Sequence, residues 1–279
     1  MSVTAASLAA AAFGAGDFLG GVAARGSDWR RVVLVALAAG LLVLVVAACF
    51  EGRPPATLPL TWCLTAGAGF AVGVSLLYRA LAEGQMTQVA PITAVVAIAV
   101  PTVVDILTGK AVTGYLFLGL GAAGLSSALL SGLSGGLYES IRNRSVIIVA
   151  IGAGFGLALF YIGLDRVDAA GGGIWGLLLV RATAFVLVAA VALKRGRSEV
   201  LHPRSLGVAV CAGLLDGTAN LMLMLAFVTG GLAETAAVAS LYPVATILLA
   251  VAVLRERPSI PQGIGLLLAI PAVLLLKSS

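Results

Sequence analysis

Residues 32–50 read VVLVALAAGLLVLVVAACF, a run without a charged side chain that would be apolar on every side of a helix. About 20 residues, each rising roughly 1.5 Å, cross a hydrocarbon core of about 30 Å as an α-helix. A transmembrane β-strand would instead alternate apolar and polar residues over about ten positions. Neither this run nor residues 180–193 alternates in that way. The run therefore predicts a membrane-spanning helix and argues against a β-barrel.

The rest of the chain has the same apolar character. Of its 279 residues, 61% are hydrophobic and 10% are charged, and the mean hydropathy is +1.12. Soluble domains carry about 25% charged residues, so this chain has too few charges to cover a water-exposed surface. The loops are short, so any chemistry must lie among the helices. We place ten apolar spans, at residues 3–24, 32–50, 60–82, 86–106, 112–131, 146–164, 172–193, 205–228, 232–254 and 260–277.

Several classes of protein do not fit this sequence. The first span is expected to be retained, because no basic segment precedes it and because it contains Asp17. The three cysteines are scattered without metal-binding spacing, so we expect neither a metal nor another cofactor. The net charge of +5 suits the headgroups of membrane lipids. It does not suit nucleic acid, because no cluster of basic and aromatic residues appears.

The chain looks duplicated. Gly84 and Gly119 match Gly230 and Gly265 at a nearly equal offset. Two halves with an odd number of spans each must insert with opposite orientations, and such inverted repeats are a recurring transporter architecture. We therefore predict an all-α integral membrane protein of ten transmembrane helices, arranged as two inverted five-helix repeats over residues 1–135 and 140–279. Further matched pairs are Ala11 and Ala153, Phe13 and Phe155, Gly14 and Gly156, and Gly21 and Gly163.

Basic residues suggest an orientation. The positive-inside rule places the loops richest in arginine and lysine in the cytoplasm. Those loops follow the odd-numbered spans, so both termini would lie outside. The richer group is Arg25, Arg30, Arg31, Arg142, Arg144, Lys194, Arg195, Arg197, Arg204, Arg255 and Arg257, against Arg53, Lys110, Arg166 and Lys277 on the other side.

Small residues and prolines punctuate the spans. Glycine pairs four residues apart, such as Gly69 and Gly73, let helix backbones approach closely in lipid. Pro91, Pro101 and Pro243 lie in the fourth and ninth spans, which correspond in the two halves. Paired interruptions of this kind indicate either a binding site or simple helix kinks.

Asp17 is the first candidate functional residue. A charge within a span costs roughly 2.5–3.5 kcal/mol on insertion scales, so such residues are functional candidates by default. Gly14 and Gly21 share a helical face with Asp17, and they would let a substrate or another helix reach its carboxylate. Asp17 is therefore either a proton or substrate site or a structural partner for an arginine.

Asp216 and Asn220 form a second candidate set, four residues apart on one face of the eighth span. They would either line a cavity or form a buried hydrogen-bonded pair between two helices.

Arg181, in the middle of the seventh span, needs a partner, and Asp17, Asp165 or Asp216 could supply one. Gln88 and Tyr242 would add hydrogen bonds inside a cavity. Arg79 and Glu83 are expected to form an interfacial salt bridge.

The segment 230–250, GGLAETAAVASLYPVATILLA, followed by LRERP at 254–258 and QGIG at 262–265, resembles an EamA-type repeat of the drug/metabolite transporter superfamily. The run 78–92, YRALAEGQMTQVAPI, resembles the matching part of the first half. The resemblance covers essentially the whole chain. It implies two inverted five-helix repeats around a central cavity, and efflux or exchange of small metabolites, such as amino acids, or of drugs.

The resemblance also bears on single residues. Asp17 is similar in placement to the first-helix acid of the small multidrug-resistance relatives, which carries protons and drug. Glu256 matches the family's usual glutamate after the ninth span, whereas Lys110 stands at the counterpart in the first half. Family members generally have cytoplasmic termini, contrary to the charge count, so the orientation stays open.

We therefore expect a secondary active transporter in the inner (cytoplasmic) membrane, an exporter or exchanger that works by alternating access, with protons as one candidate coupling ion. It would be a monomer or a homodimer. Asp17, Asp216 and Arg181 would bind protons or substrate, and Asn220, Gln88 and Tyr242 would orient substrate. One alternative is an intramembrane enzyme acting on a small or lipid substrate, which the lack of an HExxH or Cys–His set disfavours. The other is a channel, which would need a continuous polar stripe.

Overall fold

The structure is a computed structural model that describes residues 2–109, 114–130, 144–194, 201–229, 232–239, 241–255 and 260–277. Within these ranges the chain is helical and contains no strand, as predicted. The helices are α1 (Ser2–Arg25), α2 (Trp29–Glu51), α3 (Leu60–Glu83), α4 (Met86–Leu107), α5 (Gly114–Leu130), α7 (Arg144–Ala169), α8 (Gly173–Lys194), α9 (Pro203–Thr229), α10 (Leu232–Ala239), α11 (Pro243–Leu254) and α12 (Ile260–Lys277).

Eight stretches of the described helices are long and apolar enough to cross a membrane. They correspond to the first four predicted spans and to the sixth to ninth. The fifth and tenth predicted spans correspond to α5 and α12, whose apolar segments, Phe117–Ser126 and Gly263–Ala272, are shorter. The protein is therefore a multi-pass membrane protein, and the count of ten crossings stays a prediction.

The ninth predicted span, residues 232–254, is wrong as a single helix, because the chain breaks between α10 and α11. The amides of Leu241 and Tyr242 bond back to the carbonyls of Val238 and Ala239 in a tight turn. Pro243 has no amide hydrogen, so the series of helical backbone hydrogen bonds stops there, and the proline begins α11. In contrast, α4 runs unbroken through both of its prolines, so the interruptions expected in pairs occur in only one of the two spans.

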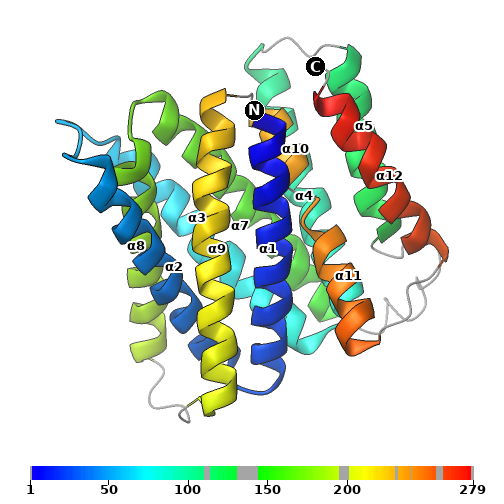
Figure 1. Cartoon of the computed structure of the whole chain (residues 1–279), viewed down its shortest axis with the longest axis horizontal. Helices are drawn as coiled ribbons and strands as arrows, with labels where there is room; N and C mark the ends of the chain where they lie inside the picture. The colour runs from blue at the N-terminus through cyan, green and yellow to red at the C-terminus, as the bar shows by residue number, and fades with distance from the viewer. Residues whose placement is uncertain are drawn as a thin grey trace.

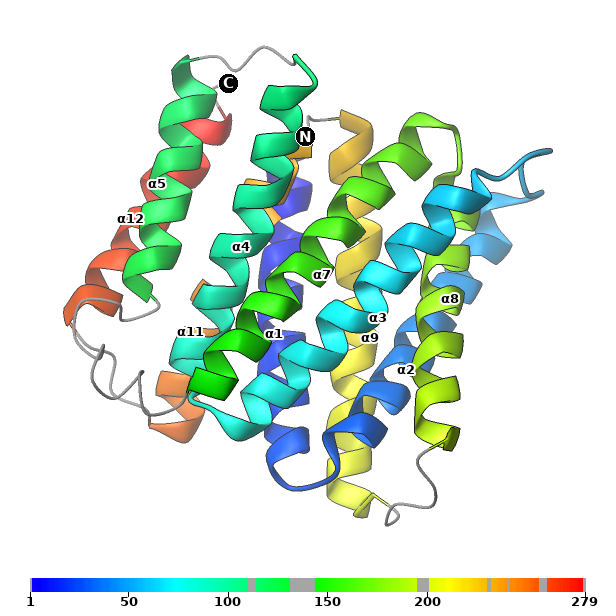
Figure 2. The same cartoon turned by 180° about the vertical axis from the view of Figure 1, so that it is seen from behind.

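The helices lie side by side in one bundle, with both termini at the same end (Figure 1). The centre is built from two helix pairs, α1 packed on α9 and α3 packed on α7. α5 and α12 pack against each other at one edge, whereas α2 and α8 lie at the opposite edge (Figures 1 and 2). The centre of the bundle is thus shared by helices from both halves of the chain.

Each major packing contact has a counterpart in the other half of the chain. α1 packs on α9 as α7 packs on α3, and α2 packs on α9 as α8 packs on α3. α4 contacts α7, and the corresponding α10 and α11 contact α1. Single residues repeat this pattern. An added Cβ on Gly67 of α3 would lie 2.6 Å from the carbonyl oxygen of Val180 in α8, and one on Gly217 of α9 would lie 2.7 Å from that of Gly40 in α2.

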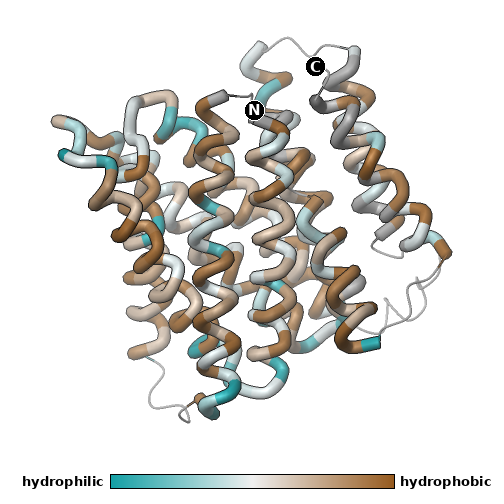
Figure 3. Tube along the Cα trace, in the orientation of Figure 1, coloured by the Kyte–Doolittle hydropathy of each residue, from teal (hydrophilic) through white to brown (hydrophobic). Residues whose placement is uncertain are grey.

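The outside of the bundle is largely apolar, and hydrophilic segments lie mainly towards the helix ends (Figure 3). Basic side chains concentrate at the end where α1, α3 and α8 finish and where α2, α7 and α9 begin, the lower end in Figure 1. We call this the basic end. Its described basic residues are Arg25, Arg30, Arg31, Arg79, Arg144, Lys194, Arg204 and Arg255, whereas the opposite end carries Arg53, Arg166 and Lys277.

Candidate functional site

A small cavity lies where α1, α3, α7 and α9 meet. Its volume is about 20 Å³, enough for roughly one water molecule. Two carboxylates line it, Asp17 from α1 and Asp216 from α9, together with Tyr242 from the break before α11. The remaining wall is apolar or aromatic and consists of Phe13, Phe70, Val74, Leu77, Leu157, Phe160 and Tyr161.

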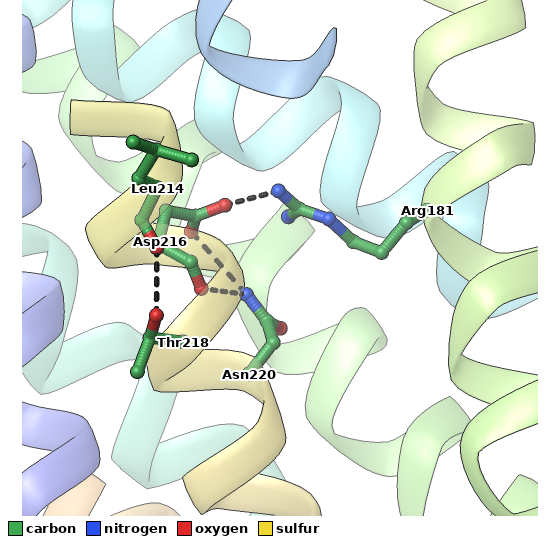
Figure 4. Close-up of polar contacts among 5 residues, drawn as sticks. All are labelled: Arg181, Leu214, Asp216, Thr218 and Asn220. Carbon is green, nitrogen blue, oxygen red and sulfur yellow. Dashed lines mark hydrogen bonds and ion pairs between the residues drawn. The ribbon is translucent and has the colours of Figure 1, made fainter. Parts of the chain in front are cut away.

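Asp216 forms an ion pair with Arg181, which reaches across from α8 (Figure 4). The arginine donates from Nη2 to Oδ2 of the carboxylate. Its side chain is 0% exposed, and that of Asp216 is 16% exposed. Of the three acids that could have partnered Arg181, the structure therefore selects Asp216. Asp17 is thus not the partner of Arg181 in this structure.

Asn220 supports Asp216 from the next turn of α9. Its side-chain amide donates to the backbone carbonyl of Asp216 at 2.7 Å and to carboxylate Oδ1 at 3.3 Å (Figure 4). Thr218 instead bonds to the carbonyl of Leu214, and its side chain is exposed. Asn220 is buried but is not part of the cavity wall, so in this structure it positions the carboxylate.

An aromatic ring holds the other side of the Arg181 guanidinium. The guanidinium carbon lies 4.0 Å from the centroid of Phe70, a cation–π contact. Phe70 in turn meets Phe160 edge-on, with the ring centroids 4.8 Å apart. Nε and Nη1 of Arg181 are buried and have no hydrogen-bond partner among the described residues. The ring face thus stabilises a charge whose hydrogen bonds are incomplete.

Glycine makes room for this ion pair. An added Cβ on Gly40 of α2 would lie 2.8 Å from Nη2 of Arg181 and 3.4 Å from Oδ2 of Asp216. A larger residue there would displace the pair. The pair therefore lies in the contact between α2 of the first half and α8 and α9 of the second.

Asp17 lines the same cavity, but no described side chain forms a hydrogen bond or an ion pair with it. Tyr78 of α3 packs its ring against Gly20, three residues further along α1. The site thus holds two carboxylates in different states of pairing, with Asp216 bound to a cation and Asp17 facing the cavity.

Tyr242 and Gln88 differ in placement. Tyr242 is buried, lines the cavity and donates from its hydroxyl to the carbonyl of Ala90 in α4 at 3.1 Å. Gln88 lies in the first turn of α4 and is not part of the cavity wall. Lys110 and Glu256, both used in the sequence comparison, lie outside the described residues.

Sequence reasoning missed the aromatic wall. In the sequence, Phe70 and Phe160 are not distinguished from other apolar residues. When a helix is apolar on all sides, its sequence pattern does not show whether a ring faces lipid or a cavity. One signal was available, since Phe70 stands between Gly69 and Gly73, which mark a face of α3 that packs closely on α7. Within the described residues, no group of three His, Cys, Asp or Glu side chains could hold a metal ion.

Comparison with known proteins bears on both family and fold. Residues 144–278 match the EamA-like transporter family. No curated protein matches the chain significantly. A solved structure titled only "Crystal structure of protein" superposes on 96% of this chain and 98% of its own, with a TM-score of 0.72 and 15% sequence identity. At that identity the likeness shows a shared fold alone.

Proposed function

Because residues 144–278 match the EamA-like transporter family, we propose that this chain is a secondary active transporter that moves a small molecule by alternating access. The observation that carries the proposal is the central cavity, whose wall combines helices from both halves of the chain. A site shared in this way opens to either side of the membrane as one half rocks against the other. We place the protein in the inner membrane, as an exporter or exchanger.

The packing pattern supports two five-helix repeats of opposite orientation. Exchanging the two halves converts the α1–α9 contact into the α7–α3 contact and the α2–α9 contact into the α8–α3 contact. Inverted repeats give a carrier two related conformations, and a substrate drives the cycle only through a difference in its affinity for them. The glycine contacts that accompany these crossings would let the helices slide past one another.

Asp17 is the residue we assign to protons or to a cationic group of the substrate. Arg181 already neutralises Asp216, whereas Asp17 faces the cavity without a cation among the described residues. Aromatic rings beside a carboxylate suit an organic cation, because the ring faces attract positive charge. The chemistry of the wall therefore favours small metabolites or drugs that carry a positively charged group, amino acids among them. Because the cavity has room for only about one water molecule in this structure, substrate would bind in a more open conformation of the cycle.

Transport assays in proteoliposomes test this assignment. With Asp17→Asn we expect flux driven by an imposed pH gradient to fall to background, because the amide cannot take up a proton. Glu51→Gln removes the same charge at the exposed end of α2 and should leave flux unchanged. Gradient-driven flux that survives Asp17→Asn would refute the role of Asp17 in coupling.

We further propose that the basic end faces the cytoplasm, which puts both termini outside. The described basic residues are concentrated at that end, and cytoplasmic loops carry the excess of lysine and arginine. A phosphatase that is active only outside the cytoplasm, fused to the C-terminus, should therefore be active. Activity of a matched reporter that works only in the cytoplasm would reverse the orientation.

A further inference from the structure

We propose that a lateral groove between α3 and α8, near the basic end, binds one anionic phospholipid of the adjacent leaflet. The groove has a volume of about 480 Å³, within the range of about 300–1,000 Å³ that is typical of small-molecule sites. It is lined by α3, by α8 and by the first turn of α2. It is separate from the central cavity, with which it shares no lining residue.

The groove arises because α3 and α8 pack closely at their crossing and then separate towards the basic end. Gly67 marks that point, since an added Cβ there would lie 2.6 Å from the carbonyl oxygen of Val180. From there towards the basic end the two helices diverge (Figure 2). The groove occupies the space between them, and we call its end at Arg30 and Arg79, nearest the basic end, its mouth.

The wall of the groove is apolar and open to the membrane. Val72 of α3 and Leu187 and Val191 of α8 line it and are exposed, Val191 by 54%. No charged side chain lines it between the Gly67 contact and the mouth. Ser75 supplies one hydroxyl group, and the rest of this stretch of the wall is apolar, so the wall suits an acyl chain better than a polar solute.

The mouth of the groove is basic. Arg79 uses Nε to bond Glu83 at 2.9 Å, but a guanidinium has five N–H donors, and the side chain is 41% exposed. The guanidinium carbon of Arg30 lies 4.9 Å from the ring centroid of Trp29, and Nη1 of Arg30 lies 4.0 Å from Oδ1 of Asp28. Two arginines over an apolar slot match a phosphate headgroup above its acyl chains, because guanidinium donors bind phosphate oxygens strongly.

The charge at the mouth argues against a second copy of the chain in the same place. In a twofold dimer both subunits use the same patch, so a dimer through this groove would bring two basic mouths into one interface. An anionic lipid instead neutralises them. Lys194, the last residue of α8, adds a further positive charge at the same end of the bundle.

Fluorescence of Trp29 provides the test. A variant with Trp62→Phe and Trp175→Phe keeps only the tryptophan at the mouth of the groove. In nanodiscs, brominated phosphatidylglycerol should quench Trp29 at a lower mole fraction than brominated phosphatidylcholine, and added salt should weaken that preference. Arg79→Gln and Arg30→Gln should each reduce the preference about fivefold, because each arginine near the surface contributes about that factor.

Arg204→Gln is the matched control, because it removes a charge at the same end of the bundle but outside the groove. It should leave the preference unchanged. As a second measurement, native mass spectrometry of the unsubstituted protein should show one retained phosphatidylglycerol that Arg79→Gln loses. Equal quenching by the two lipids would overturn the proposal. The proposal would also be overturned if Trp29 fluorescence in detergent without lipid changed in step with dimerisation of the protein, because a second copy would then fill the groove.

Discussion

Replacing Gly156 with valine is expected to force α7 away from α3 and to lower the free energy of unfolding by about 3 kcal/mol or more. An added Cβ at Gly156 would lie 2.6 Å from the Cα of Gly73 and 2.9 Å from the carbonyl oxygen of Gly69. Both are backbone atoms, so no side-chain rotation relieves the clash. This crossing also supports the wall of the central cavity, because Leu157 and Phe160 follow Gly156 on α7. Transport should therefore fail together with stability.

The same substitution at Gly207 gives the control. No described atom lies within 4 Å of an added Cβ at Gly207 in α9. Gly207→Val should therefore change stability by well under 1 kcal/mol, or raise it slightly, because valine forms helix better than glycine. Unfolding by denaturing detergent, followed by far-UV circular dichroism, measures both variants. Equal stability of the two would contradict the close approach of α7 and α3.

Replacing Asp216 with alanine is expected to cost about 3–5 kcal/mol of stability, because it leaves a buried guanidinium without its counter-ion. Phe70 would still contact Arg181, but a ring face does not replace a carboxylate. Arg181→Met should cost less, since Asp216 is 16% exposed and keeps its hydrogen bonds to Asn220. The double variant Arg181→Met with Asp216→Leu should recover most of the loss, because apolar residues of similar volume replace an ion pair at little cost.

A double-mutant cycle tests the pairing directly. The cycle should give a coupling free energy between Arg181 and Asp216 of about 1–3 kcal/mol. Thr218→Ala provides the control on the same helix, since Thr218 is exposed and bonds only to the carbonyl of Leu214. Its effect should add simply to that of Arg181→Met. Additive effects at Arg181 and Asp216 as well would contradict the ion pair.

Much of the fold was accessible from the sequence, because lipid imposes a strong constraint on each span. A helix in lipid must satisfy its own backbone and be about 20 apolar residues long, so α2 and α8 could be placed to within a few residues. The break before α11 could not be predicted from the sequence. Pro91, Pro101 and Pro243 look equivalent in the sequence, yet only the last interrupts its helix, because tertiary packing decides which freed carbonyl finds a new donor.

The site was less accessible than the fold. The sequence marked Asp17, Arg181 and Asp216 as unusual because they lie inside apolar spans, where a charge is costly. The choice of Asp216 as the partner of Arg181 depends on the distance between α8 and α9, which no periodicity encodes. Gln88 shows the converse. It is polar and lies within a predicted span, yet it occupies the first turn of α4 outside the cavity wall, where its polarity needs no binding role.

The pairing of Arg181 with Asp216 also has a consequence for how the proposed transport cycle would respond to voltage. A membrane potential of 100 mV exerts about 2.3 kcal/mol on each elementary charge that crosses it. The ion pair carries no net charge, so in the proposed alternating-access cycle the electric field does no net work on it if the two residues move as one unit. Asp17 has no such companion among the described residues. In the proposed cycle, the charge that the protein itself carries across the field on its return step therefore depends on whether Asp17 then holds a proton, a cation or neither.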